Sequence, residues 1–155
     1  MNTTTTIPSP PAGQDLANVP MKFEATPIPV ADFDRAKAFY QRLGWRLDID
    51  LQFTEQIRGV QFTPPGSPAS IQFAPAGPKP LQRLLLVVDD IEAARNELID
   101  RGIDVGEIWH AAPGQPPEPG RDPRGQSYSS QAAFSDPDGN QWVLQEVTER
   151  IPGRV

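Results

Sequence analysis

Hydrophobic and polar residues alternate in two ways along this chain, first with the spacing of a strand and then with that of a helix. Residues Phe23–Val30 are predicted to be extended, because Pro27 and Pro29 lack a backbone donor and disfavour helix. Prolines at these positions also favour the edge of a sheet. A helix is predicted to begin after Asp32, a good N-cap, and to end at Gly44. Its apolar residues share one stripe: Phe33, Ala36, Tyr40 and Leu43.

Runs of apolar residues separated by turn residues predict the remaining elements. Three strands should follow the first helix, at Trp45–Phe53, Ile57–Thr63 and Ser70–Ala74. The second half begins with an apolar strand, Leu84–Val88, and a helix capped by Asp90 and ended by Gly102. Three more strands are expected there: Val105–His110, Gln131–Phe134 and Trp142–Val147.

The two halves follow one plan. Four positions of the first half match four positions of the second at an offset of 58: Val30, Asp32, Ala36 and Gly44 match Val88, Asp90, Ala94 and Gly102. Pro64 and Gly66 match Pro137 and Gly139 at an offset of 73. The 15 additional residues fall in Ala111–Gly125, a Pro- and Gly-rich loop expected only in the second half. An internal duplication is therefore predicted, with modules at about 21–77 and 81–148 that bury a shared face.

Composition sets limits on organisation and on partners. A chain of 155 residues suits one domain, predicted over 21–150, after a flexible Thr- and Pro-rich leader at 1–20. The absence of cysteine excludes disulfides and thiolate metal sites. A net charge of −6 argues against nucleic-acid partners, and no apolar run is long enough to span a membrane. We therefore expect a cytoplasmic protein.

Three segments together resemble the vicinal oxygen chelate superfamily, which includes glyoxalase I, extradiol dioxygenases and bleomycin-binding proteins. They are residues 30–45 (VADFDRAKAFYQRLGW), 88–94 (VDDIEAA) and 134–142 (FSDPDGNQW), and the resemblance covers about residues 22–148. It implies an α+β fold in which two βαβββ modules in tandem form a curved, incompletely closed sheet around a cleft. It also implies a homodimer, since members pair modules within a chain or between chains.

Enzymes of that superfamily hold a divalent metal with His or Glu at four strand positions. Aligned through the motifs, these positions correspond here to Ala25, Ser70, Arg83 and Val143. None is a usual ligand for a catalytic divalent metal, and a permanently protonated Arg would repel one. We therefore expect no metal or other cofactor at the family site.

Several polar residues remain as candidates for chemistry in the cleft. Arg83 heads an apolar strand, where its charge suits a carboxylate or an enolate in place of the metal. His110, at the end of a strand and beside the long loop, is a candidate general base or ligand contact. Both are also compatible with purely structural roles. Further candidate ligand contacts are Trp109, Tyr128, Gln72 and Gln145, the last two placed on the same faces as Ser70 and Val143.

Other residues are given structural roles. Phe73, Phe134 and Trp142 are expected in the core, and Glu146 is expected to face solvent from the opposite side of its strand. The segment 136–140 (DPDGN) is interpreted as a tight turn rather than a metal loop. Arg121–Arg124 is interpreted as a solvated charge cluster, in a loop that gates the cleft.

Three functions are compatible with these features. The first is a metal-independent protein that binds a small organic molecule by sequestration or carriage. The second is an enzyme of lyase, isomerase or dioxygenase type that uses Arg83 and His110 or an atypical metal site. The third is a regulatory module whose cleft is vestigial.

Overall fold

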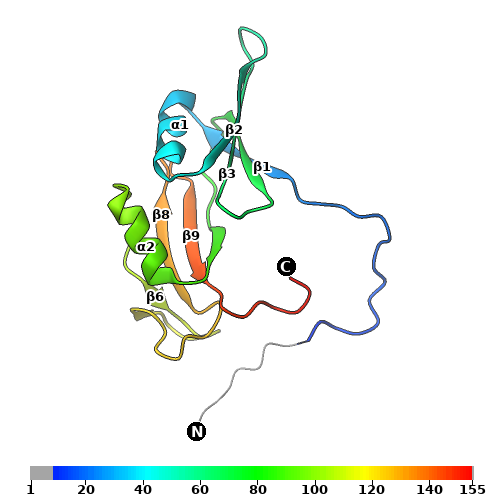
Figure 1. The fold of residues 1–155 in the computed structure, drawn as a ribbon, viewed down its shortest axis with the longest axis vertical. Helices are drawn as coiled ribbons and strands as arrows, with labels where there is room; N and C mark the ends of the chain where they lie inside the picture. The colour runs from blue at the N-terminus through cyan, green and yellow to red at the C-terminus, as the bar shows by residue number, and fades with distance from the viewer. Residues whose placement is uncertain (1–8, 155) are drawn as a thin grey trace.

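The structure, a computed structural model, describes residues 9–154 and contains two separate mixed sheets, each with one helix (Figure 1). The first half holds β1 (Ala25–Val30), α1 (Phe33–Arg42), β2 (Arg46–Gln52), β3 (Arg58–Thr63) and β4 (Ser70–Pro75). The second holds β5 (Leu84–Val88), α2 (Ile91–Asp100), β6 (Trp109–His110), β7 (Glu118–Pro119), β8 (Ser130–Ser135) and β9 (Gln141–Glu146). The predicted α+β class and the open sheets are confirmed.

Both helices begin and end where the sequence predicted, and for the same local reasons. The side chains of Asp32 and Asp90 accept hydrogen bonds at 3.0 Å from the backbone N–H groups of Arg35 and Ala93. Beyond the C-terminal ends, Gly44 and Gly102 both have φ of 81°, a conformation that glycine adopts without steric cost.

The strand order is β1-β4-β3-β2 in the first sheet and β5-β9-β8-β6-β7 in the second. In each sheet the strand before the helix pairs in parallel with the last long strand, as β1 does with β4 and β5 with β9. The register relates the two sheets by two different offsets. Val30 pairs with Pro75, and Val88 pairs with Glu146, so the first strands are offset by 58 residues and the last strands by 71.

The offset of 71 differs from the 73 obtained from the preceding turns, because those turns are unequal in length. Residues 136–140 close tightly, with the N–H of Gly139 and of Asp136 bonded to Asp136 and Asn140 carbonyls, whereas β4 begins four residues after Gly66. The sheet position of Ser70 therefore corresponds to Gln141, and that of Gln72 corresponds to Val143.

The strand predicted at Val105–His110 is shorter than expected. Only Trp109 and His110 are in a strand, and β7, which pairs with them, lies inside the segment that was predicted to be irregular. The side chain of Arg95 donates hydrogen bonds to the carbonyls of Val105 and Gly106, so these groups do not continue a sheet ladder. Val105 is nonetheless buried and contributes to the core.

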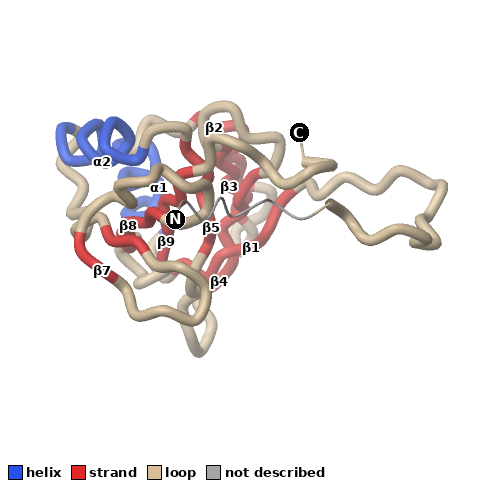
Figure 2. The backbone as a smooth tube through the Cα atoms, turned by 90° about the horizontal axis from the view of Figure 1, so that it is seen from below, coloured by secondary structure: helices blue, strands red, loops and turns tan. Residues whose placement is uncertain are grey.

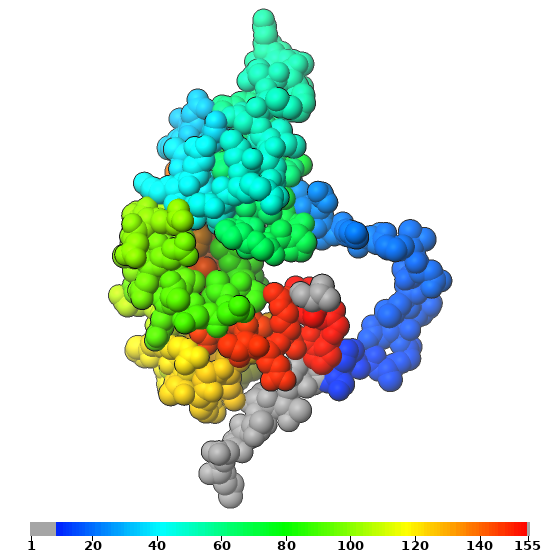
Figure 3. Space-filling view, viewed as in Figure 1, coloured from blue at the N-terminus to red at the C-terminus, as the bar shows by residue number. Residues whose placement is uncertain are grey.

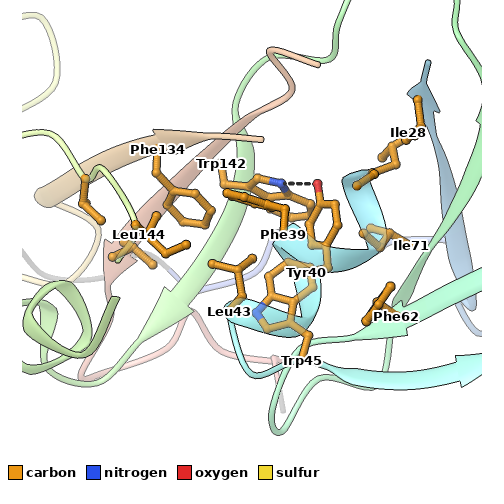
Figure 4. Packing of buried hydrophobic residues seen from close by; sticks show 14 of the residues in the cluster. Ile28, Phe39, Tyr40, Leu43, Trp45, Phe62, Ile71, Phe134, Trp142 and Leu144 are labelled. Atoms are coloured by element: carbon orange, nitrogen blue, oxygen red, sulfur yellow. Dashed lines mark hydrogen bonds between the residues drawn. The ribbon is translucent and has the colours of Figure 1, made fainter. Parts of the chain in front are cut away.

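One hydrophobic core joins the two halves, and aromatic rings from both meet around Tyr40 (Figure 4). The Tyr40 hydroxyl donates to Asp136 at 2.8 Å and accepts from the indole N–H of Trp142 at 3.0 Å. Burial of the ring, with Asp136 close by, raises the pKa of Tyr40 far above its ordinary value. The prediction that Phe73, Phe134 and Trp142 belong to the core is confirmed.

The two helices lie on the same side of the molecule (Figure 2). Within residues 9–154, neither helix reaches the length and apolar character needed to cross a bilayer. The predicted leader at 1–20 lies partly outside the described residues. Its described part, 9–20, is exposed, contains no helix or strand, and belongs to an arm that stands away from the body (Figures 1 and 3).

Replacing Tyr40 by Phe should destabilise the fold by about 2 kcal/mol, because the buried N–H of Trp142 loses its acceptor. Urea-induced unfolding followed by tryptophan fluorescence measures this loss. Tyr128→Phe is the matched control, since among residues 9–154 the Tyr128 hydroxyl accepts only from the exposed Ile151 N–H. The control should change stability by less than about 0.5 kcal/mol. Equal effects of the two variants would contradict a central role for the Tyr40 hydroxyl.

Candidate functional site

Each sheet packs one face against the helices. The other face carries both exposed residues, such as Leu85, and buried ones, such as Thr63 and Val143. We call these two faces the first and second open faces. On β5, Leu84, Leu86 and Val88 pack against the core. Leu85 and Val87, which alternate with them, are 52% and 38% exposed. Register extends these faces across the sheets. The first open face carries Ala25, Pro27, Ile49, Leu51, Gly59, Gln61, Thr63, Ser70 and Gln72, and the second carries Leu85, Val87, Trp109, Gln131, Ala133, Val143 and Gln145.

The four positions assigned from the sequence motifs do not offer a set of metal ligands, and neither does the set in which Gln72, the register counterpart of Val143, replaces Ser70. Ala25 and Ser70 are register partners on the first open face, and Val143 lies on the second beside Leu85. Ala and Val side chains have no donor atom, and the Ser70 hydroxyl is hydrogen-bonded to Thr63 at 2.6 Å. Within residues 9–154 no cluster of three His, Cys, Asp or Glu side chains is arranged to hold a metal ion. The residues at this site therefore do not fit the divalent metal of the family's enzymes.

Arg83 lies just before β5, in a left-handed conformation with φ of 56° that is unusual for a residue other than glycine. Its N–H donates to the Gln141 side chain at 3.2 Å, and its guanidinium donates to Gln131 at 3.4 Å. Arg83 is exposed, and these contacts hold it at the border of the second open face.

Of the other predicted site residues, Trp109 and Gln145 share the second open face. They lie in one register row, Val87–Gln145–Gln131–Trp109. The Gln145 amide donates to the carbonyl of Tyr128 at 3.0 Å. Tyr128 itself has φ of 70°, and its hydroxyl accepts from Ile151, so it anchors the C-terminal segment.

His110 lies on the other side of the second sheet. It follows Trp109 in β6, and consecutive strand residues point to opposite faces. Its register row contains Ser130, Glu146 and Val88 on the helix-covered face. Its ring contacts the Gly120 carbonyl at 2.7 Å through Nδ1 and the Glu118 carboxylate at 3.2 Å through Nε2. The structure therefore does not bring His110 and Arg83 together.

Glu146 is buried, at 1% exposure, and the expectation that it faces solvent is wrong. Its carboxylate accepts from the Ile91 N–H at the start of α2 at 3.0 Å and pairs with the Arg121 guanidinium at 2.8 Å. Asp122 is also buried, at 1% exposure, so 121–124 is not simply a solvated charge cluster. These contacts attach the long loop to the helix-covered face, because a buried carboxylate needs a charged partner.

Sequence reasoning missed the most connected polar residue of the first open face, Asp48. Strict alternation places Asp48 on the same face as Asp50, which pairs with Lys37 and Arg58 on the helix side. A β-bulge between Leu47 and Ile49 adds one residue to β2 and turns Asp48 to the open face instead. No signal in the local sequence marks this bulge.

Asp48 begins a chain of hydrogen bonds that crosses three strands. It accepts from Arg46, from the Thr63 hydroxyl and from the Gln61 amide at 3.3 Å. Gln61 in turn accepts from the Gln72 amide at 3.0 Å. Beside this chain is a hollow of about 230 Å³, lined by Ile49, Phe53, Gly59, Val60, Gln61, Gln72 and Phe73.

The chain matches the model of a known protein family and is similar to several solved structures. The sequence profile described as Glyoxalase/Bleomycin resistance protein/Dioxygenase superfamily matches residues 22–144. TnmS3, an antibiotic binding protein from Streptomyces sp. CB03234, is 30% identical with a TM-score of 0.62, over 82% of this chain and 96% of that one. A superfamily member from Sphaerobacter thermophilus DSM 20745 is 30% identical with a TM-score of 0.59, over 81% and 97%.

A bleomycin-binding protein complexed with bleomycin shares the fold, with 22% identity, a TM-score of 0.53 and coverage of 81% of this chain and 98% of that one. A search of curated protein sequences found no match.

Acid should weaken the fold partly through Asp48. Hydrogen bonds from Arg46 and Thr63 lower the pKa of Asp48 from 3.8 to about 2. A carboxyl whose pKa is lower in the folded state stabilises that state above its unfolded pKa, and the effect is lost as pH falls through the folded pKa. The stability advantage of the wild type over Asp48→Asn should therefore shrink between pH 4 and pH 2. Urea unfolding across this range measures it, and a difference that stays constant would contradict the ionised role of Asp48.

Proposed function

Because the chain belongs to the glyoxalase/bleomycin resistance protein/dioxygenase superfamily, we propose that it binds a small organic molecule on its open faces without a divalent metal. The observation that carries this proposal is the first open face, where an apolar hollow adjoins a chain of oriented polar side chains. Binding sites for small molecules typically combine apolar walls with a few fixed polar groups. The antibiotic binding protein TnmS3 supports a role in sequestration or carriage.

The composition of the open faces supports binding rather than catalysis. The family metal positions supply no ligand set, and the proposed acid–base partner His110 lies on the opposite side of the sheet from Trp109 and Gln145. An enzyme that uses Arg83 and His110 together has no support from this geometry. We therefore assign no reaction step to either residue.

We also propose that the protein acts as a homodimer in which a second copy covers part of the open faces. The support is the exposure of large apolar side chains on them, with Leu51 at 56% and Leu85 at 52%. The hairpin joining β2 and β3 also projects from the body (Figure 3) and exposes Phe53 and Ile57 at 61% and 57%. Exposed large apolar side chains are common at interaction sites, and β5 is an apolar strand at the edge of its sheet.

Ligand binding should be detectable and independent of divalent metal. We expect at least one member of a panel of antibiotics and aromatic metabolites to raise the melting temperature, because a ligand that binds only the native state stabilises it. The shift should be the same in EDTA and with added Mn²⁺, Ni²⁺, Zn²⁺ or Fe²⁺. A melting-temperature shift that requires a metal would overturn the proposal of metal-independent binding. A panel without any stabilising member would favour a vestigial cleft.

The dimer should depend on the apolar open faces. Sedimentation velocity at micromolar concentration should give twice the mass of one chain, and Leu85→Gln should shift the protein toward monomer. Ile99→Gln on α2 is the matched control, since Ile99 is similarly exposed at 42% but lies outside both sheets. Both substitutions are on the surface, so neither should change monomer stability by more than about 0.5 kcal/mol. A monomeric wild type, or equal dissociation by both variants, would contradict this arrangement.

A further inference from the structure

We propose that the hollow on the first open face is a subsite for a flat ring bearing an amide or lactam, and that Gln72 determines this preference. The inference rests on the proposed binding function and specifies one part of the ligand. It follows from the direction of the hydrogen bonds that run from Asp48 to Gln72.

The first group in this chain of hydrogen bonds is the Asp48 carboxylate, which only accepts hydrogen bonds. The Asp48 carboxylate is paired with Arg46 and also accepts from Thr63, which is itself buried at 3% exposure. An ionised carboxylate offers no hydrogen to a neighbour. Gln61 must therefore turn its NH₂ group toward Asp48, as its 3.3 Å contact shows.

The orientation of Gln61 then determines the orientation of Gln72. With its NH₂ group on Asp48, Gln61 presents its carbonyl oxygen to Gln72, so Gln72 must present its own NH₂ group in return. The 3.0 Å bond from Gln72 Nε2 to Gln61 Oε1 has this direction. Donor and acceptor chemistry thus fixes both amides, which are otherwise free to rotate by half a turn.

Gln72 is the last residue in this chain of hydrogen bonds, and its amide can make further hydrogen bonds. One of its two amide hydrogens is used on Gln61, and within residues 9–154 its carbonyl oxygen makes no hydrogen bond. Gln72 is exposed and lines the hollow, so a remaining N–H and the C=O are available to a ligand. An amide or lactam offers the complementary pair of groups and satisfies both.

The walls of the hollow favour a flat apolar body for this ligand. Ile49 forms one wall, and the Phe53 ring lies directly against Gly59, where an added Cβ would be 2.6 Å from the ring. Aromatic rings bind such surfaces by stacking and by burial of apolar area. A volume of about 230 Å³ is smaller than a typical complete site for a drug-sized molecule, so it suits one ring system of a larger ligand.

Three matched probes test the chemistry: 2-naphthamide, N,N-dimethyl-2-naphthamide and 2-naphthoate. The second lacks the N–H donor, and the third also places an anion against the carbonyl of Gln72. NMR titration of the full chain should show 2-naphthamide binding about tenfold or more tightly than either analogue, the value of one well-made hydrogen bond. The side-chain NH₂ resonances of Gln72 should shift with the first probe.

Variants test whether the hydrogen bonds from Asp48 to Gln72 determine the preference for an amide. Gln72→Met keeps the size of the side chain and should bring the three affinities within about twofold. Asp48→Asn, whose amide accommodates either orientation of Gln61, should reduce the preference for 2-naphthamide in the same direction. Asp50→Asn is the matched control, with the same change on the same strand but on the helix-covered face, and should leave the preference unchanged.

The inference is overturned if no probe binds, if 2-naphthoate binds as tightly as 2-naphthamide, or if Asp50→Asn acts like Asp48→Asn. These outcomes are distinct from failure of the proposed function, which the thermal-shift panel reports on its own. A panel ligand that stabilises the protein without shifting Gln72 would leave ligand binding in place and refute this subsite.

Discussion

A buried hydroxyl joins the two halves of this protein at the centre of their shared core. Tyr40 extends from the helix of the first half and is bonded at the same time to Asp136 and Trp142 of the second. The same turn has further attachments. Asn140 donates to the Pro29 carbonyl and accepts from the Leu81 N–H, and Asp138 accepts from the Ala31 N–H. Polar groups buried in this way are directional, so they define the angle between the halves more narrowly than apolar packing alone. The positions of both open faces follow from that angle.

Within the first half, a single inserted residue in β2 places two carboxylates of one strand on opposite faces of the sheet. The bulge in β2 leaves Asp50 on the helix side, where it pairs with Lys37 and Arg58, and turns Asp48 to the other side. Two carboxylates of one strand therefore serve two different surfaces. The first holds the strand against α1, and the second orients the amides that border the hollow.

Local features of this fold were predictable from the sequence, and features that depend on distant partners were not. The N-caps at Asp32 and Asp90 and the apolar run at Leu84–Val88 need only neighbouring residues, and all were located correctly. The burial of Glu146 depends on Arg121, which lies 25 residues away along the chain. Alternation along β9 identified the face of Glu146 but not the loop that covers it. The bulge at Asp48 similarly arises from pairing with β3, which no pattern within β2 records.

The attachment of the long loop restricts how this protein can be altered. Arg121 supplies the charge that allows the Glu146 carboxylate to remain buried at the start of α2. A shortened chain without this loop would retain a carboxylate enclosed by apolar groups and without a counterion, which is costly. The loop and the Glu146 carboxylate are therefore energetically coupled, and removal of either requires a compensating substitution of the other. Because the unit lies on the helix-covered side, such an exchange can proceed without disturbing the row of Trp109, Gln131 and Gln145 on the opposite surface.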